Sequence, residues 1–196
     1  MSEADFKARY RVDPDPWSYA TSGYERDKYG ATLAACGPGP FASAIELGGS
    51  IGVFSELLAP RCRSLVTIDS APTAVAAARR RLAGLSATST SSPRSPAVTA
   101  VLGSIPEAIP RRGYDLVVAS EILYYLDAAR LGETLAVLRE CTDPGARWVA
   151  VHWRPAGPER PFDAAQVHEL LCAQPWLAPV GSASTDDYLL DILERR

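Results

Sequence analysis

Strand patterns that alternate with helical patterns constrain the fold of this chain more than any other feature. Short apolar segments at 42–47, 65–69, 97–102, 114–119 and 147–152 read as buried strands, and helical patterns occupy 22–36, 53–59, 71–82 and 127–141. Strands that alternate with helices form βαβ units, whose strands pair in parallel. The sequence therefore predicts an α/β fold of the Rossmann-like class, with helices on both faces of the sheet.

The C-terminal part of the chain departs from this alternation. A helix is predicted over 164–172, followed by strands over 176–183 and 188–193 that are joined only by a turn around Asp186. Two strands with so short a connection must be antiparallel. We therefore expect a seven-stranded, mostly parallel sheet that ends in an antiparallel hairpin.

A chain of 196 residues has the size of one ordinary domain. Residues 1–16 are predicted to be an extended N-terminal segment, because Asp13-Pro14-Asp15-Pro16 disfavours helix. Residues 17–196 are then a single domain. The stretch at 86–95, SATSTSSPRS, has no apolar periodicity and is predicted to be a flexible surface insertion, with a lid or acceptor loop as the alternative.

Charge and cysteine usage exclude several classes of partner. The net charge of -3 provides no basic surface, so neither nucleic acid nor an anionic membrane is an expected partner. The N-terminal residues lack the apolar segment of a secretory signal, and no apolar run is long enough to span a bilayer. We therefore expect a cytoplasmic protein. The cysteines are scattered singly without metal-ligand spacing, so we expect reduced thiols and no metal site.

A glycine-rich segment follows the first predicted strand. It reads Glu46-Leu47-Gly48-Gly49-Ser50-Ile51-Gly52, and Asp69 ends the second strand about 20 residues further on. Ligands of doubly wound sheets bind at the carboxyl ends of the strands, where glycines let backbone N–H groups approach closely. An acidic side chain at the end of the second strand accepts hydrogen bonds from ribose hydroxyls. The sequence predicts a site for a nucleoside-containing cofactor.

The glycine spacing distinguishes two classes of cofactor. The dinucleotide pattern G-x-G-x-x-G, started at Gly48, requires glycine where this chain has Ser50 and Val53. The pattern Glu-x-Gly-x-x-x-Gly instead resembles the class I methyltransferases that use S-adenosylmethionine, from about Trp17 to the end of the chain. The alternatives are an NAD-dependent oxidoreductase and a non-catalytic partner protein that binds S-adenosylmethionine.

Three further segments narrow the resemblance. Asp15-Pro16-Trp17 with Thr21-Ser22, Leu58-Ala59-Pro60-Arg61-Cys62, and Ser120-Glu121-Ile122-Leu123-Tyr124-Tyr125-Leu126 resemble the nodulation protein S family. These are N-methyltransferases of glucosamine-containing oligosaccharides. The resemblance implies a small-molecule acceptor that contains a sugar, methylated on an amine or a hydroxyl, and a protein that is a monomer or a homodimer.

The same resemblance implies a set of cofactor-binding residues. The glycines of the loop would surround the methionine portion, with Glu46 bracing the loop or the amino group. Asp69 would hold the ribose, and Ser70 would lie near the adenine. Ser104 stands where relatives often have an aspartate toward the adenine amino group, and Ile105 would pack on the ring. Independently of the resemblance, Trp17 and Tyr24 are candidates for a lid, with ordinary helix packing as the alternative. The complete predicted set is Trp17, Tyr24, Glu46, Gly48, Gly49, Gly52, Asp69, Ser70, Ser104, Ile105 and Ser120.

Three residues are candidates for handling the acceptor. His152 ends the fifth strand and is the candidate general base, since an unperturbed imidazole titrates near neutral pH; the alternative is a packed, hydrogen-bonded ring. Glu121 ends the fourth strand and is expected to orient an amine or attract a cation, with charge pairing at a helix N-terminus as the alternative. Tyr124 and Tyr125 are expected to divide between the core and the site, with one phenol facing the acceptor and Tyr124 as the candidate. His168 is predicted to be structural or exposed.

Overall fold

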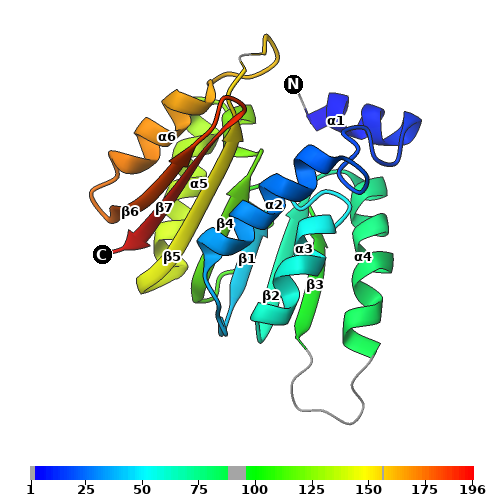
Figure 1. The fold of residues 1–196 in the computed structure, drawn as a ribbon, viewed down its shortest axis with the longest axis horizontal. Helices are drawn as coiled ribbons and strands as arrows, with labels where there is room; N and C mark the ends of the chain where they lie inside the picture. Colours follow the sequence, from blue (N-terminus) through cyan, green and yellow to red (C-terminus); the bar gives the residue numbers. More distant parts are fainter. Residues whose placement is uncertain (1–2, 88–95, 156) are drawn as a thin grey trace.

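The computed structural model describes residues 3–87, 96–155 and 157–196. They form a seven-stranded sheet in the order β3-β2-β1-β4-β5-β7-β6, which confirms the predicted Rossmann-like class (Figure 1). The strands β1 to β5 are parallel, and β7 runs antiparallel to both β5 and β6. Their bounds are β1 Ala44–Leu47, β2 Ser64–Asp69, β3 Ala97–Leu102, β4 Tyr114–Ser120, β5 Thr142–Trp153, β6 Leu177–Ser184 and β7 Tyr188–Arg195.

Helices cover both faces of the sheet, as predicted. Buried side chains of α2 and α3 pack on one face with Leu65, Leu116 and Val149, and Figure 1 shows these helices in front of the sheet. Those of α5 and α6 pack on the other face with Ile45, Val117 and Trp148. The bounds are α2 Gly23–Cys36, α3 Val53–Leu58, α4 Pro72–Ala87, α5 Ala128–Glu140 and α6 Ala164–Cys172, with short 3₁₀ turns η1 Ala59–Arg61 and η2 Leu123–Tyr125.

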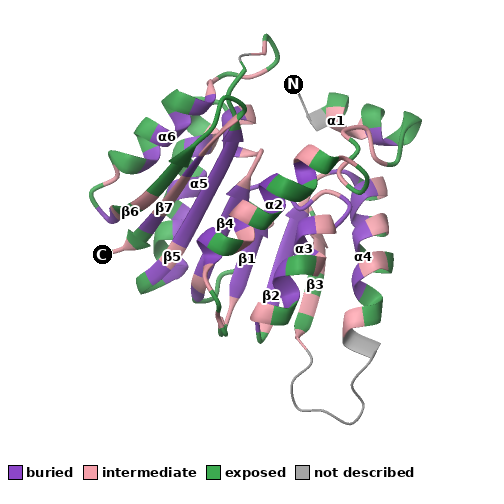
Figure 2. Cartoon of the chain, viewed as in Figure 1, coloured by how far each residue is buried: buried purple, intermediate pink, exposed green. Residues whose placement is uncertain are grey.

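The central strands are buried along both faces. All four residues of β1 are buried, as are most residues of β4, and Figure 2 shows β1, β4 and β5 largely in the buried colour. Strands covered on both faces read as continuous apolar runs, which is why these segments were recognisable in the sequence. The core therefore fixes the strands whose carboxyl ends carry the candidate site residues.

The N-terminal segment differs from the prediction. Residues Glu3–Val12 form helix α1, so the expected extended conformation of 1–16 is wrong over that range. The helix ends immediately before Asp13-Pro14, in agreement with the effect of proline on the preceding residues. Phe6 and Tyr10 lie four residues apart and therefore share one helix face, and Tyr10 is buried. Packing of that face stabilises a helix that is otherwise polar.

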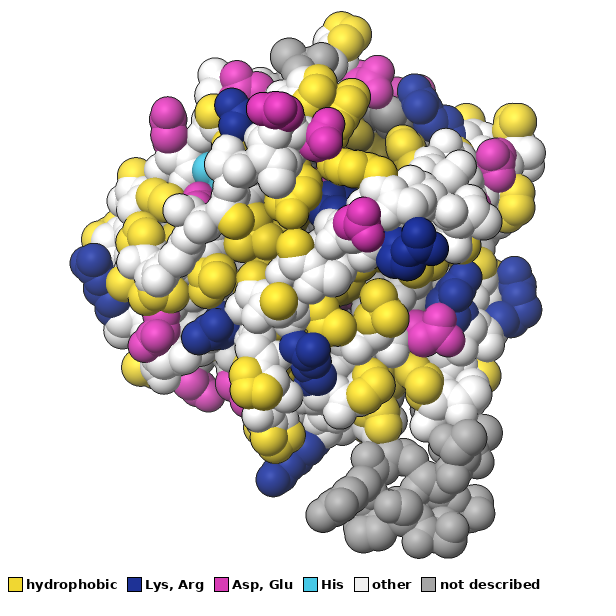
Figure 3. All heavy atoms as spheres, viewed as in Figure 1, with side chains coloured by type: hydrophobic (Ala, Val, Ile, Leu, Met, Phe, Trp, Pro, Cys, Tyr) yellow, Lys and Arg dark blue, Asp and Glu magenta, His cyan; other side chains and the backbone are white. Residues whose placement is uncertain are grey.

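The low-complexity stretch predicted at 86–95 lies largely outside the described residues, which resume at residue 96. In the sequence it follows α4 and precedes β3. Figure 1 shows α4 beside the β3 edge of the sheet. Among the described residues, no helix is long and apolar enough to cross a membrane. Acidic and basic side chains are interspersed over the face in Figure 3, without a continuous basic patch.

Candidate functional site

A cavity of about 260 Å³ opens at the carboxyl ends of the parallel strands. Residues from β2, from the loops after β1, β3 and β4, and from the N-terminal segment surround it. A smaller hollow, lined in part by Glu46, Gly49 and Ser120, adjoins it, and both share Tyr19, Gly48, Ser50 and Glu121. The residues that line the larger cavity are Phe6, Tyr10, Trp17, Tyr19, Gly48, Ser50, Ile68, Asp69, Ser70, Gly103, Ser104, Ile105, Glu121, Ile122, Tyr125, Leu126, Asp127 and Arg130.

The loop after β1 requires glycine for steric reasons. Gly48 has φ +71°, and a Cβ there would lie 3.0 Å from Cβ of Ile122. A Cβ on Gly49 would lie 1.7 Å from Oγ1 of Thr67 on the neighbouring strand. The loop therefore packs closely on both sides, and any side chain at these two positions would push it away from the cavity.

Asp69 is fixed at the end of β2 by backbone groups. Its Oδ1 accepts a hydrogen bond from the N–H of Ala71 at 2.8 Å, and its Oδ2 accepts one from the N–H of Ser50 at 3.0 Å. Burial raises the pKa of this carboxyl, and hydrogen bonds from the backbone of Ala71, Ser50 and Ser70 oppose the rise. A carboxylate can accept about four hydrogen bonds. Asp69 thus retains acceptor capacity toward the cavity that it lines.

Glu46 lies beneath the glycine loop. It is buried, and its Oε2 accepts a hydrogen bond from the hydroxyl of Ser55. Burial raises the pKa of Glu46 to about 7, although hydrogen bonds from Ser55 and Thr67 partly offset the rise. Glu46 thus links β1 to both α3 and β2 beside the loop, and its role in bracing the loop or holding the amino group stays a prediction.

Glu121 is held at the boundary between the two hollows. It has φ +57°, which is uncommon for a residue other than glycine. Its Oε1 accepts a hydrogen bond from Nζ of Lys28 at 2.8 Å, and its Oε2 accepts from the N–H of Trp153 at 3.0 Å and from the hydroxyl of Tyr124. Strained backbone with several well-made contacts is a common feature of functional sites.

Lys28 carries the positive charge of this cluster. Its side chain is only 2% exposed, and its Nζ also contacts Oε1 of Glu25 at 3.0 Å. Burial raises the pKa of Glu25, and the adjacent Lys28 partly offsets this. A buried ammonium between two carboxylates compensates the charge of Glu121 without closing it off from the cavity.

Tyr124 contacts the site only through Glu121. It does not line either hollow, and its hydroxyl donates to the Glu121 carboxylate. Burial, and then the negative charge of Glu121, raise the pKa of the Tyr124 phenol. The neighbouring Tyr125 lines the cavity instead. The predicted role of Tyr124 toward the acceptor is therefore indirect in this geometry.

His152 is fully buried and does not line the cavity. Its Nε2 accepts a hydrogen bond from the N–H of Leu123 at 3.2 Å, and its Nδ1 lies 3.1 Å from Nε2 of His168. Burial lowers its pKa well below the usual value, and electrostatic interactions with His168, Lys28 and Arg160 lower it further. This arrangement is the packed, hydrogen-bonded ring that the sequence left as the alternative to a general base. His168 is buried too, with His152 and Asp191 as partners.

Two predicted cofactor residues lie outside both hollows. Gly52 has φ +79°, and a Cβ there would approach Ala78 of α4 at 3.1 Å, so it permits close packing of α3 on α4. Tyr24 lies with its ring beside Nζ of Lys28, at 5.1 Å from the ring centroid. The other predicted positions, including Trp17, Ser70, Ser104, Ile105 and Ser120, line one hollow or the other.

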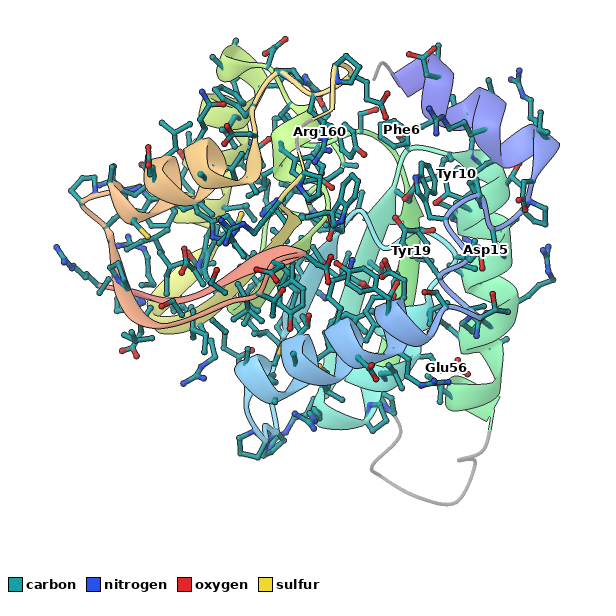
Figure 4. All side chains as sticks on the ribbon, turned by 45° about the horizontal axis from the view of Figure 1, so that its top comes forward. Phe6, Tyr10, Asp15, Tyr19, Glu56 and Arg160 are labelled. Carbon is teal, nitrogen blue, oxygen red and sulfur yellow. The ribbon has the colours of Figure 1, made fainter. Side chains whose placement is uncertain are left out.

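Helix α1 contributes a cavity wall that the sequence interpretation missed. Phe6 contacts Tyr125 edge to face at a ring-centroid distance of 4.8 Å, and Tyr10 contacts Trp17 at 5.4 Å. The hydroxyl of Tyr10 is hydrogen-bonded to the hydroxyl of Ser50 in the glycine loop. Figure 4 shows Phe6, Tyr10 and Tyr19 gathered on one side of the site, with Arg160 opposite. The four-residue spacing of Phe6 and Tyr10 is the sequence feature that could have indicated a helix with an apolar face here.

No group of three or more metal-ligating side chains occurs within the described ranges.

Comparisons with known proteins agree with this geometry. A sequence model of the nodulation protein S family matches residues 4–141. Nodulation protein S of Rhizobium tropici is 32% identical over 149 residues, which cover 74% of this chain and 58% of that protein. The corresponding protein of Bradyrhizobium diazoefficiens is 34% identical over 113 residues, which cover 57% of this chain and 49% of that protein. The matches thus span about half the length of these relatives.

Solved structures give the same assignment of fold. The N-methyltransferase NodS of Bradyrhizobium japonicum, in complex with S-adenosylhomocysteine, superposes with a TM-score of 0.79 and 22% identity, covering 100% of this chain and 99% of that chain. A putative methyltransferase of Pseudomonas syringae is 33% identical with a TM-score of 0.73, covering 89% of this chain and 100% of that chain. The family model matches most of this chain, and the solved structures share its fold. This chain therefore belongs to the nodulation protein S family.

Proposed function

We propose that this protein is a methyltransferase that uses S-adenosylmethionine to methylate an amine of a small, sugar-containing molecule. The observation that carries the proposal is the cavity itself. There the carboxylate of Asp69 and the glycine loop face Glu121 across one continuous space. The complex of the related NodS with S-adenosylhomocysteine supports the cofactor, and the family supports the amine.

The residues around the cavity fit this cofactor by their chemistry. The spare acceptor capacity of Asp69 suits two ribose hydroxyls, Ile105 offers an apolar surface for the adenine, and Ser70 and Ser104 offer hydroxyls at its edge. Gly48 and Gly49 leave room for the methionine portion beside Ser120 and Glu121. When bound, the cofactor supplies an electrophilic methyl group on a sulfonium.

The charge of the cavity favours an amine acceptor. Asp69, Glu121 and Asp127 line it together with one basic residue, Arg130, which pairs with Glu107. Aromatic rings of α1 and of the segment after it complete the wall, and rings and carboxylates both attract an ammonium ion. A protonated amine would therefore concentrate here, with its nitrogen directed at Glu121.

The proton balance also favours an amine over a hydroxyl. An amine needs to lose only its ammonium proton before its lone pair can attack, whereas a hydroxyl needs a stronger base. Among the described lining residues no histidine is present. Glu121 can orient the ammonium by accepting a hydrogen bond from it. The ammonium then loses one proton to solvent, and its lone pair attacks the methyl group of the sulfonium.

Methyl transfer to matched acceptors tests this proposal. Short glucosamine oligosaccharides with a free amine would be incubated with the protein and labelled S-adenosylmethionine, beside the same oligosaccharides carrying an N-acetyl group. We expect label on the free amine only, because an amide nitrogen has no available lone pair. Labelling of the fully acetylated sugar would indicate a hydroxyl acceptor, and failure to label any amine would contradict the proposal.

A further inference from the structure

A chain of hydrogen bonds runs from the last strand to the turn that follows Glu121. Oδ2 of Asp191 in β7 lies 2.7 Å from Nδ1 of His168 in α6, and Nε2 of His168 lies 3.1 Å from Nδ1 of His152 in β5. Nε2 of His152 then meets the backbone N–H of Leu123 at 3.2 Å. His152 is 0% and His168 5% exposed. The contacts in this chain join side chains of β7, α6 and β5 to the first residue of η2.

Only one placement of protons satisfies every contact. The N–H of Leu123 can only donate, so Nε2 of His152 must be the unprotonated acceptor. The proton of a neutral His152 is then on Nδ1 and is donated to Nε2 of His168. His168 in turn carries its proton on Nδ1 and donates it to the carboxylate of Asp191. Both imidazoles are thus neutral and both are Nδ1–H tautomers.

Three consecutive residues of β5 hold the segment that contains Glu121. The carbonyl of Val151 accepts from the N–H of Glu121 at 2.8 Å, and the N–H of Trp153 donates to the Glu121 carboxylate at 3.0 Å. Between them, His152 accepts from Leu123 and packs against the ring of Tyr124, with ring centroids 4.9 Å apart. The side chain of His152 therefore links β5 to η2 through Leu123. It also supports the ring of Tyr124, whose hydroxyl donates to Glu121.

We propose that His152, His168 and Asp191 are positioning residues that hold Glu121 and Tyr124 in place through the backbone of Leu123. This role rests on the proposed function, because Glu121 is taken to face the acceptor. It also replaces the general-base role: His152 has no free nitrogen with which to accept a proton from an acceptor. The contact through which they act is the one between Nε2 of His152 and the N–H of Leu123, and His168 with Asp191 fixes the tautomer of His152 that makes this contact. Loss of the contact with Leu123 would lower the rate of methyl transfer while leaving cofactor binding at Asp69 intact.

The proton arrangement can be tested without any activity. The protein contains only two histidines, His152 and His168. Untagged protein labelled with ¹⁵N in its imidazoles therefore gives two ring systems in a long-range ¹H–¹⁵N spectrum. We expect both rings at pH 7.5 to show a protonated Nδ1 and an unprotonated Nε2. A ring with its proton on Nε2, or protonated on both nitrogens, would overturn the hydrogen-bond chain.

Two conservative variants of His152 test its influence on the site. In His152→Gln the amide lies near the position of Nε2 and can still accept from Leu123. In His152→Asn it lies near the position of Nδ1 and leaves Leu123 without an acceptor. We expect His152→Gln to retain at least about a third of kcat and His152→Asn to lose about tenfold or more, with S-adenosylhomocysteine dissociation constants within about twofold of each other.

The other outcomes are equally informative. A comparable loss of about 10²-fold or more in both variants would restore His152 as the general base, since neither amide can titrate. Equal retention of kcat in both would show that the contact with Leu123 does not act on the site. Lack of methyl transfer by the unmodified protein would contradict the proposed function. The imidazole spectrum tests the hydrogen-bond chain independently of activity.

Discussion

At the scale of single residues, three acidic side chains of the candidate site differ in their surroundings. Asp69 is held by two backbone N–H groups and keeps acceptor capacity, Glu46 is buried beneath the glycine loop, and Glu121 is compensated by Lys28. Sequence position alone made all three candidates, because each lies within a strand or directly after one near the carboxyl edge of the sheet. Their partners could not be read from it: Lys28 lies in α2, and its ion pair with Glu121 depends on packing across the sheet.

Replacement of Asp69 should weaken cofactor binding. In Asp69→Ala the ribose hydroxyls lose a charged acceptor, and we expect the binding free energy of S-adenosylhomocysteine to fall by about 1–3 kcal/mol, measured by isothermal titration calorimetry. Glu140→Gln is the control, because Glu140 at the end of α5 is exposed, pairs with Arg111 and does not line the cavity. Equal affinities of Asp69→Ala and the control would remove Asp69 from the binding site.

Glu46 predicts a pH dependence of stability with a definite sign. Its folded pKa of about 7 lies above the usual carboxyl value of 4.5, so the folded state binds its proton more tightly. The contribution of Glu46 to stability is therefore present below about pH 4.5 and lost as pH rises to about 7. The loss corresponds to roughly 3 kcal/mol as an order of magnitude.

A comparison with Glu46→Gln isolates this effect, since the other titrating groups are common to both proteins. Relative to the variant, the unmodified apoprotein should become less stable between pH 5 and pH 8, as measured by urea unfolding. A difference in unfolding free energy that stays constant with pH would mean that Glu46 is ionised in the folded protein throughout this range.

At the scale of elements, the predicted strands and most helices agree with the structure to within a few residues, because apolar runs and glycine or proline boundaries define them locally. Helix α1 was missed for a physical reason. Phe6 and Tyr10 make apolar contacts with Tyr125 and Trp17, and Tyr10 also packs with Ile51, Ala71 and Ala74. These partners are distant in the sequence or follow a Pro-rich turn. The burial of His152 could not be read from the sequence for a related reason: it depends on α6 packing beside β5 and β7, which the end of a strand does not reveal.

Helix α1 is expected to contribute to binding more than to folding. In the double variant Phe6→Ala, Tyr10→Ala the cavity loses two aromatic walls, and we expect affinity for S-adenosylhomocysteine to fall about tenfold or more, as measured by calorimetry. Val12→Ala in the same helix is the matched control, because Val12 is 89% exposed. Unchanged affinity, with α1 still formed by circular dichroism, would show that this helix is not part of the cofactor site.

At the scale of the whole molecule, the strand order places every parallel strand with its carboxyl end at the edge where the cavity opens. The reversal of order lies between β1 and β4, and the glycine loop and Glu121 follow these two strands. A doubly wound sheet binds its ligand at that reversal. The alternation of patterns and the antiparallel C-terminal hairpin were sufficient to predict this arrangement, whereas the cavity wall from α1 required the folded structure.

The most direct measurement of the central claim is a calorimetric titration of the purified protein with S-adenosylhomocysteine and, separately, with NAD. The glycine loop and the position of Asp69 predict saturable binding of S-adenosylhomocysteine, at one molecule per chain, and no binding of NAD. Binding of NAD, or the absence of any heat of binding with S-adenosylhomocysteine, would contradict the assignment of this cavity to a methyltransferase.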